Sequence, residues 1–166
     1  MLTSRKIDDL TFPAKIRALE FVHRCKVAGL DMLVTCTYRD AEAQAALYAQ
    51  GRTKPGRIVT NARPGESMHQ YRVALDVVPM RHGKLVWGTS GNGIDDDPTD
   101  DDIDDLELWQ RIAVIGESCG LEWAGRWKRF RELPHFQFTG GLTLDDFKAG
   151  REIPRELWTP SFKEAA

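Results

Sequence analysis

The segment from Ser67 to Asp76 constrains this chain more than any other, because it places an imidazole and a carboxylate a short turn apart. Its second half, residues 73–78, alternates like a β-strand and is rich in β-branched residues. On such a strand Ala74 and Asp76 share one face, and the small alanine leaves room for an ion beside the carboxylate. His69 lies an odd number of residues from Asp76, so it must sit in the preceding turn and fold back.

A second imidazole and carboxylate occur later in the chain. Residues 133–138 predict a short strand on which His135 and Gln137 point to the same side. Pro134 keeps the residue before it extended, which displaces Glu132 from the strand by a bend. Taken alone, a histidine beside proline and phenylalanine is more often a core residue than a ligand. The repetition of the histidine–carboxylate pair favours a metal site instead.

Imidazole nitrogen and carboxylate oxygen are ligands that suit Zn²⁺, and a catalytic zinc needs three protein ligands plus an open position for water. His69, Asp76, Glu132 and His135 are therefore candidate residues for such a site, and the bend at Pro134 could bring the Glu132 carboxylate to a zinc-bound water rather than to the metal.

These motifs resemble those of a known superfamily. Ser67-x-His69 followed by Asp76, and Glu132-x-x-His135, are similar to the motifs of the LAS zinc peptidases. That superfamily includes the VanX and VanY D-Ala-D-Ala peptidases and the L-alanyl-D-glutamate endopeptidases of phage endolysins. The likeness to the endolysin branch extends to three further segments, residues 37–39, 44–53 and 120–123. The resemblance covers roughly residues 10 to 140, which is most of the chain.

The resemblance implies an α+β fold of the Hedgehog/DD-peptidase type, a small antiparallel sheet flanked by helices with a mononuclear zinc site. It also implies a zinc metallopeptidase that hydrolyses the L-alanyl-D-glutamate bond of the peptidoglycan stem peptide and lyses the bacterial host. The resemblance further implies one zinc ion per chain, held by His69, Asp76 and His135, with Glu132 beside the zinc-bound water as the general base. Arg39 stabilises the oxyanion or anchors a peptide carboxylate.

One position departs from the family pattern. Arg72 stands in the turn between the first two ligands, where the family usually has glycine. If that turn needs a positive φ, Arg72 carries backbone strain.

Further candidate site residues surround the motifs. A buried strand over residues 31–37 is expected to deliver Tyr38 and Arg39 to its end. Asp40 then caps a helix that runs through Tyr48, and Gln44 on its first turn supports the site.

The segment that follows, residues 52–66, has no clear period and is predicted to form one wall of the substrate groove. Ser67, at its end, is expected to bond a ligand carboxylate or the loop backbone.

The remaining elements follow from periodicity and turn residues. We expect a helix over residues 12–29, a hairpin of residues 73–80 with 84–87, a helix over 106–119, a strand over 121–123 and a short helix over 142–149. They form a single peptidase domain, residues 1–166, with its core at about 10–150 and no separate cell-wall-binding domain. The tail beyond Ile153 is predicted to be weakly ordered, although Trp158 can dock on the body.

The net charge of −2 hides an asymmetry, because eight of the 25 acidic residues lie between Asp95 and Asp105. The rest of the chain has 23 basic residues against 17 acidic ones, which suits an anionic partner such as the bacterial envelope. A Ca²⁺ site in the run from Asp95 to Asp105 is possible in principle. The run lacks the glycine and terminal glutamate of an EF-hand loop, so a solvated acidic loop is the favoured interpretation.

Aromatic and basic residues interleave after residue 122. Trp123, Trp127 and Phe130 alternate with arginine and lysine in a way that resembles a nucleic-acid stacking surface. No nucleic-acid recognition motif accompanies them. We therefore predict that they form the rim of the substrate groove, with Trp123 as a substrate-binding or supporting residue, and that nucleic acid is not a partner.

Composition also bears on where such a chain works. Three widely spaced cysteines are typical of buried, reduced thiols in a cytosolic product. No Cys-x-x-Cys pair occurs, which argues against a thiolate zinc site. No signal peptide and no membrane span are visible. A monomer without stable membrane association is expected in the host cytoplasm, acting on peptidoglycan after a holin permeabilises the membrane.

Two other functions fit the same motifs. A D,D-carboxypeptidase or dipeptidase acting on D-Ala-D-Ala ends would use the same ligands and differ only in the bond cut. A catalytically inactive, zinc-stabilised cell-wall-binding module is the alternative from another class. The presence of Glu132 argues against that module, because a structural zinc needs no base beside an open position.

Overall fold

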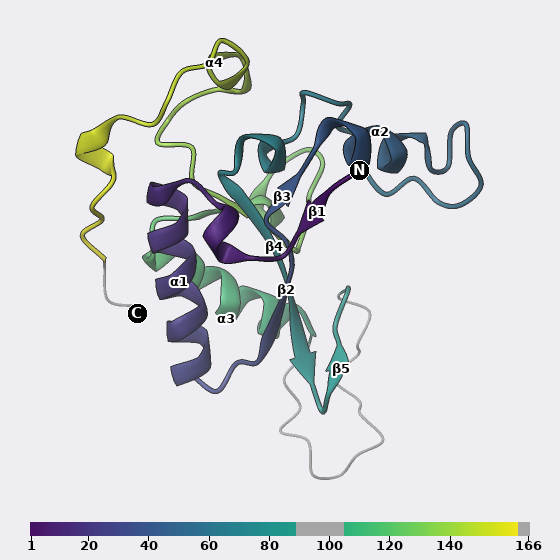
Figure 1. The fold of residues 1–166 in the computed structure, drawn as a ribbon. Helices are drawn as coiled ribbons and strands as arrows, with labels where there is room; N and C mark the ends of the chain where they lie inside the picture. Colours follow the sequence, from purple (N-terminus) through teal and green to yellow (C-terminus); the bar gives the residue numbers. More distant parts are fainter. Residues whose placement is uncertain (89–104, 163–166) are drawn as a thin grey trace.

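In a computed structural model, which describes residues 1–88 and 105–162, one antiparallel sheet and two long helices make the body of the protein (Figure 1). The sheet has the strand order β2-β4-β7-β6, with a hairpin partner, β5, on β4. Its strands are β2 (Met32–Cys36), β4 (Ala74–Arg81), β5 (Lys84–Leu85), β6 (Glu122–Trp123) and β7 (His135–Gln137). This α+β architecture confirms the predicted fold class.

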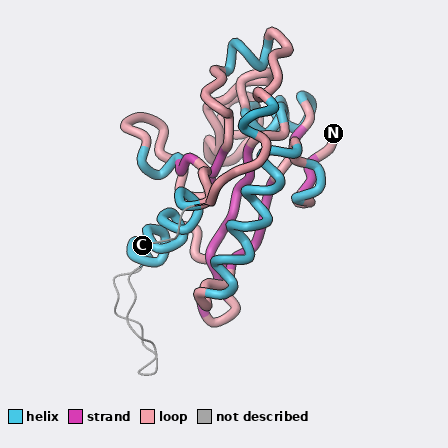
Figure 2. Tube along the Cα trace, turned by 90° about the vertical axis from the view of Figure 1, so that its left-hand side faces the viewer, coloured by secondary structure: helices cyan, strands magenta, loops and turns pink. Residues whose placement is uncertain are grey.

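Two helices, α1 (Phe12–Val27) and α3 (Asp105–Ser118), cover one face of the sheet. Figure 2 shows the first of them lying along the strands. The core between the layers contains Phe21 from α1, Trp109 from α3 and Phe136 from β7, all three completely buried. Burying aromatic side chains of this size is the largest stabilising contribution that such an interface makes.

Strand β4 follows the alternation that the sequence predicts. Leu75 and Val77 lie in the helix-facing core, whereas Asp76 points to the other face. The expectation of a buried strand at residues 31–37 is wrong in one respect. Strand β2 pairs only with β4 and forms an edge of the sheet, so that Leu33 keeps 37% of its surface exposed. A short apolar run does not distinguish an edge strand from a central one.

The shorter elements surround this body. They are β1 (Thr3–Ser4), β3 (Tyr38–Arg39), α2 (Ala41–Ala49), α4 (Leu144–Lys148) and the 3-10 helices η1 (Ile7–Asp9), η2 (Met68–Tyr71), η3 (Ala124–Arg126) and η4 (Arg155–Leu157). Helix α2 begins as predicted, because the Asp40 side chain accepts a hydrogen bond of 2.7 Å from the Ala43 backbone N–H. Within the described residues, no helix is both long and apolar enough to cross a membrane.

The C-terminal segment packs against α1. Arg17, on α1, donates from Nη2 to the Leu157 carbonyl at 2.9 Å, and its guanidinium lies 3.5 Å from the centre of the Phe138 ring. The Trp158 indole N–H donates to the Ile153 carbonyl at 2.9 Å, and its ring lies 5.7 Å from the Phe12 ring of α1, so Trp158 docks on the body as expected. The predicted weak order of the tail beyond Ile153 stays a prediction.

Arg72 adopts the left-handed conformation, with φ 60° and ψ 32°, directly between η2 and β4. Its side chain has compensating contacts. The guanidinium lies 3.8 Å from the centre of the Tyr38 ring and donates to the Asp9 carbonyl at 2.9 Å. The positive φ reverses the chain direction, so that η2 folds back over the start of β4.

We expect Arg72→Gly to be more stable than Arg72→Ala by about 1 kcal/mol, because a Cβ in the left-handed region carries a steric cost that glycine avoids. Both variants lose the contacts to Tyr38 and Asp9, so the difference isolates the backbone strain. Chemical denaturation measures both free energies of unfolding. An alanine variant as stable as the glycine variant would show that the turn does not depend on a positive φ.

Candidate metal centre

Three strands place three potential metal ligands in one row across the sheet. Asp76, on the central strand β4, pairs with His135 on β7 on one side and with Cys36 on β2 on the other. Residues directly opposite each other on antiparallel strands bring their side chains within contact distance. A register irregularity between Val34 and Cys36 accompanies the pairing with β2.

The fourth potential ligand comes from the turn before β4. His69 lies in η2 and is 3% exposed, and its Nε2 is 3.1 Å from Asp76 Oδ1. His135 Nδ1 lies 3.2 Å from the same Asp76 oxygen, and the two imidazole rings are 5.0 Å apart. The structure therefore brings His69, Asp76 and His135 together, in agreement with the geometry expected from the motif.

The partly buried Asp76 carboxylate and the buried His69 imidazole change each other's pKa. Burial raises the pKa of Asp76, but the charges and hydrogen bonds of His69 and His135 outweigh it and hold that pKa well below its usual value. Burial lowers the pKa of His69, and the Asp76 carboxylate reverses this, so that the pKa of His69 is raised. Asp76 thus remains a negatively charged centre that attracts a proton or a cation.

Cys36 is the member of this cluster that the sequence did not reveal. Ligand atoms of Cys36, His69 and Asp76 all lie within 4.8 Å of one another. All three cysteines are free and buried, as expected. The only sequence signal for Cys36 was its place near the end of a predicted strand, two residues before the Tyr38–Arg39 pair. The argument against a thiolate ligand, based on the lack of a Cys-x-x-Cys pair, did not anticipate this position.

Arg39 reaches the same cluster from β3. Its Nη2 donates to Cys36 Sγ at 3.4 Å and lies 3.9 Å from Asp76 Oδ2, while Nη1 donates to Gln44 Oε1 at 2.9 Å. Gln44 is completely buried and donates in turn to the Ala62 carbonyl at 2.7 Å. Gln44 therefore joins the guanidinium to the loop that was predicted to wall the groove.

A cleft of about 680 Å³ opens over the cluster. Its lining includes six of the predicted site residues, namely Arg39, Ser67, His69, Asp76, Glu132 and His135. Thr60 and Ala62 also line it, so the segment over residues 52–66 forms one wall as predicted. Glu132 is half exposed, and its Oε2 lies 4.0 Å from His135 Nδ1, just before the Pro134 bend.

Three of the predicted site residues, Gln44, Trp123 and Tyr38, do not line the cleft. Trp123 is 4% exposed and stacks on Phe136 in the core, and its indole N–H donates to the Leu133 carbonyl at 2.7 Å. It supports the chain that leads into β7 and is too deeply buried to contact a substrate. Tyr38 packs under the Arg72 guanidinium instead of facing the metal ligands.

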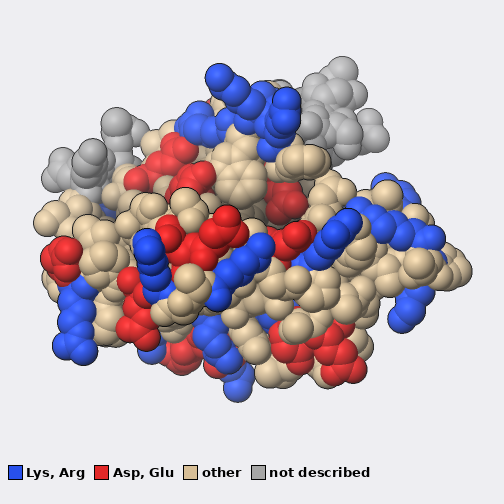
Figure 3. All heavy atoms as spheres, turned by 90° about the horizontal axis from the view of Figure 1, so that it is seen from above, with Lys and Arg blue, Asp and Glu red and all other residues tan. Residues whose placement is uncertain are grey.

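Acidic and basic side chains are interspersed on the face of the molecule seen from above, with several acidic side chains near its middle (Figure 3). Arg52, in the loop after α2, stacks on Tyr48 at 4.0 Å and donates to the Thr60 carbonyl at 3.0 Å. This basic residue therefore helps to hold the wall of the cleft. The proposed Ca²⁺ site between Asp95 and Asp105 lies outside the described residues, apart from Asp105 itself.

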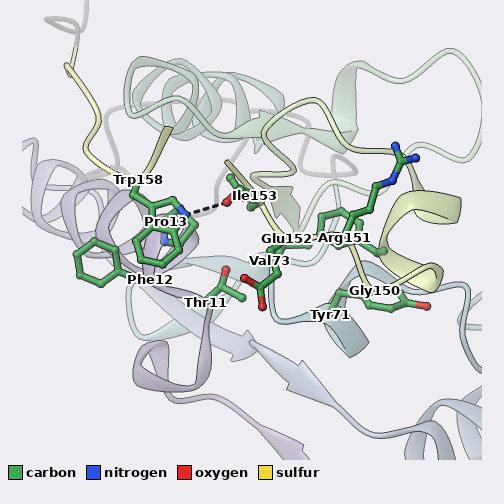
Figure 4. A pocket seen from close by; sticks show the side chains of 11 residues that line it. Thr11, Phe12, Pro13, Tyr71, Val73, Gly150, Arg151, Glu152, Ile153 and Trp158 are labelled. Carbon is green, nitrogen blue, oxygen red and sulfur yellow. Dashed lines mark hydrogen bonds between the residues drawn. The ribbon is translucent and has the colours of Figure 1, made fainter. Parts of the chain in front are cut away.

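A second pocket, of about 440 Å³, lies between the start of α1 and the C-terminal segment (Figure 4). Phe12 and Trp158 form one wall, and the hydrogen bond from Trp158 to Ile153 closes it, as the dashed line in Figure 4 marks. None of the metal-cluster residues lines this pocket.

Comparison with known proteins identifies related sequences. Residues 60–138 match a family model described as D-alanyl-D-alanine carboxypeptidase. The chain is 37% identical over 110 residues to the peptidoglycan L-alanyl-D-glutamate endopeptidase CwlK of Bacillus subtilis. These matches confirm the resemblance to LAS-type peptidases. The aligned region covers 66% of this chain and 61% of CwlK, so the chain spans less than two thirds of that relative.

Solved structures support the same fold. The L-Ala D-Glu endopeptidase ChiX of Serratia marcescens superposes with a TM-score of 0.53 at 21% identity, covering 88% of this chain and 92% of ChiX. The L,D-carboxypeptidase DacB from Streptococcus pneumonia also gives a TM-score of 0.53, at 18% identity, covering 95% of this chain and 80% of that one. At these identities the comparison establishes the architecture shared with LAS-type peptidases and nothing finer.

Proposed function

We propose that this chain is a zinc-dependent peptidoglycan peptidase that hydrolyses the L-alanyl-D-glutamate bond of the stem peptide. The observation that carries the proposal is the convergence of His69, Asp76 and His135 in a cleft that also contains Glu132 and Arg39. The identity to CwlK, whose name gives this activity, supports the choice of bond.

The donor set fits a zinc ion. Two imidazole nitrogens lie 3.1 and 3.2 Å from one carboxylate oxygen. Ligand atoms around a tetrahedral zinc, with bonds of about 2.0 Å, are about 3.3 Å apart. Asp76 is negatively charged and lies, partly buried, between two histidines, a combination that is stable when a cation or a proton joins them. His69, Asp76 and His135 would therefore hold the metal, and zinc supplies a Lewis acid that activates water and polarises a carbonyl.

The chain's own residues provide the rest of the chemistry. Glu132 lies close to His135 but is not one of the three proposed ligands. Its half-exposed carboxylate can take a proton from the attacking water and pass it to the leaving amine. Arg39 presents a guanidinium held by Gln44, which favours a carboxylate of the peptide or the developing oxyanion. The walls formed by residues 52–66 and by Glu132 to Pro134 confine the peptide between these groups.

Metal content tests the ligand assignment. We expect one zinc per chain and loss of hydrolysis when the metal is removed. His69→Ala and His135→Ala should lose zinc and have a lower melting temperature, because metal bound to the folded state stabilises it. Cys36→Ser should keep its zinc, since the thiol already accepts a hydrogen bond from Arg39. If His135→Ala keeps its zinc and Cys36→Ser loses it, Cys36 and not His135 is the third zinc ligand. Full hydrolysis by metal-free protein would exclude the zinc mechanism.

Glu132→Gln tests the general base. This change keeps the shape of the side chain and removes its ability to accept a proton, so hydrolysis of purified peptidoglycan should fall by roughly 10²–10⁴-fold. Zinc content and melting temperature should match those of the parent chain. If the variant loses zinc, Glu132 is a ligand; if it hydrolyses at the parent rate, another group is the base.

Mass spectrometry of the digested peptidoglycan identifies the bond. New N-terminal D-glutamate is expected from the proposed activity. Release of terminal D-alanine would instead support the second candidate, a D,D-carboxypeptidase, which the description of the matching family model favours. The absence of any cleavage by zinc-loaded parent protein would favour a cell-wall-binding module.

The biological role is also part of the proposal. We infer a phage endolysin that accumulates as a monomer in the host cytoplasm and reaches peptidoglycan through a holin-type membrane lesion. The likeness of residues 44–53 and 120–123 to the endolysin branch supports it. Production inside a susceptible bacterium should cause lysis only when a holin is co-expressed, and the Glu132→Gln variant serves as the control. Lysis without a holin would contradict this route to the wall.

A further inference from the structure

Behind His135 a chain of hydrogen bonds leads away from the metal cluster. His135 Nε2 lies 3.1 Å from Gln137 Oε1, and Gln137 Nε2 donates to Glu122 Oε2 at 3.1 Å. The other Glu122 oxygen accepts a hydrogen bond from the Trp127 indole N–H. His135 and Gln137 are each 6% exposed, whereas Glu122 and Trp127 are at the surface.

Backbone register builds this chain. Gln137 follows His135 by two residues on β7, so both side chains point to the same face of the sheet. Glu122 on β6 is the direct cross-strand partner of Gln137, in the same way that Asp76 on β4 is the partner of His135. Four side chains, from Asp76, His135, Gln137 and Glu122, therefore lie in order across the strands β4, β7 and β6. Trp127, directly after η3, is the member of the chain that comes from outside the sheet.

The Trp127 indole, at the surface end of this hydrogen-bond chain, determines which groups donate and which accept along it. The Trp127 indole can only donate, and a carboxylate can only accept. With both Glu122 oxygens accepting, the Gln137 amide must turn its NH₂ group toward Glu122 and its oxygen toward His135. That oxygen requires an N–H on His135 Nε2.

A neutral imidazole has one N–H, so a proton on Nε2 leaves Nδ1 as a bare lone pair. His135 Nδ1 is the atom that faces Asp76 Oδ1 at 3.2 Å. Without an acceptor behind Nε2, the proton would be more stable on Nδ1, where it could donate to the Asp76 carboxylate. A proton in that position would occupy the place of the metal.

We propose that Gln137 is a positioning residue that selects the metal-binding tautomer of His135, and that Glu122 and Trp127 set the orientation of Gln137. This inference deepens the proposed zinc peptidase function and rests on it. It assigns a role to three residues, Gln137, Glu122 and Trp127, that lie outside the ligand set and do not line the cleft.

The decisive variant is Glu122→Gln, which replaces one carboxylate oxygen with an NH₂ group at a residue outside the proposed ligand set. The new amide oxygen would accept from the Trp127 indole, and its NH₂ group would then face Gln137. Gln137 would have to reverse, turning its own NH₂ group toward His135 Nε2 and moving the proton to Nδ1. We expect a 10–100-fold weaker affinity for zinc, the usual effect of losing a partner of a metal-bound histidine.

The double variant Glu122→Gln with Gln137→Glu provides the rescue. It keeps the composition and the net charge, and it restores an acceptor facing His135 Nε2, because the new carboxylate accepts from both His135 and the new amide. Zinc affinity should return to within roughly 2–5-fold of the parent value. Glu152→Gln, which removes the same charge from an exposed side chain in the second pocket, is the matched control and should bind zinc like the parent.

Two measurements on the full-length chain test the inference. Titration with zinc against a chromophoric chelator gives the dissociation constants. Two-bond ¹H–¹⁵N NMR of labelled histidine, in metal-free protein at mildly alkaline pH, shows which His135 nitrogen carries the proton. We expect Nε2–H in the parent, in the control and in the double variant, and Nδ1–H in Glu122→Gln.

Parent protein with the proton on Nδ1, or a Glu122→Gln variant with parent-like tautomer and zinc affinity, would overturn the inference. A weakened single variant that the double variant does not rescue would also overturn it, because a purely structural role predicts no recovery. The proposed function fails separately: a parent chain that shows the expected tautomer and binds zinc, but cleaves no peptidoglycan, would remove the peptidase and leave the positioning role intact.

Discussion

The register of β4 against its two neighbours at Asp76 is the constraint on which the site depends. Cys36, Asp76 and His135 are opposite one another on three strands. A slip of one residue would turn Asp76 into the core and Leu75 into the cleft, because side chains alternate along a strand. The packing of Leu75 and Val77 against the two helices opposes such a slip. The apolar core thus specifies the metal centre from the opposite face of the sheet.

From that row, hydrogen-bonded side chains extend in two directions. On the β7 side, His135 leads through Gln137 to Glu122 at the surface. On the β2 side, Arg39 leads through Gln44 to the wall of the cleft. Both connecting residues are buried amides, which offer a donor and an acceptor at once. Gln44 therefore accepts a hydrogen bond from Arg39, and Gln137 pairs with His135, without adding a further charge to the interior. An unpaired charge there would be costly.

The match to the family model covers some of the cleft residues and leaves others outside it. The family match over residues 60–138 contains His69, Asp76, Glu132 and His135. It excludes β3 and α2, which carry Arg39 and Gln44, so the interpretation of those two residues depends on the geometry of this cleft. Arg72 is a particular feature as well. Its backbone adopts the left-handed conformation that glycine adopts most readily, and its side chain compensates by contacts to Asp9 and Tyr38.

The sequence by itself predicted most of the longer elements and most of the side chains that meet in the cleft. Helical and alternating periodicity located α1, α2 and β4, and the spacing of His69 to Asp76 required the turn that η2 makes. Tertiary structure alone decided that Cys36 joins the cluster, that Trp123 is buried away from the cleft, and that Glu122 stands behind His135 through Gln137. The physical reason is that periodicity reports which face of its own strand a residue occupies. It does not report which residue of another strand lies opposite, and that register follows only from packing the whole sheet against its helices.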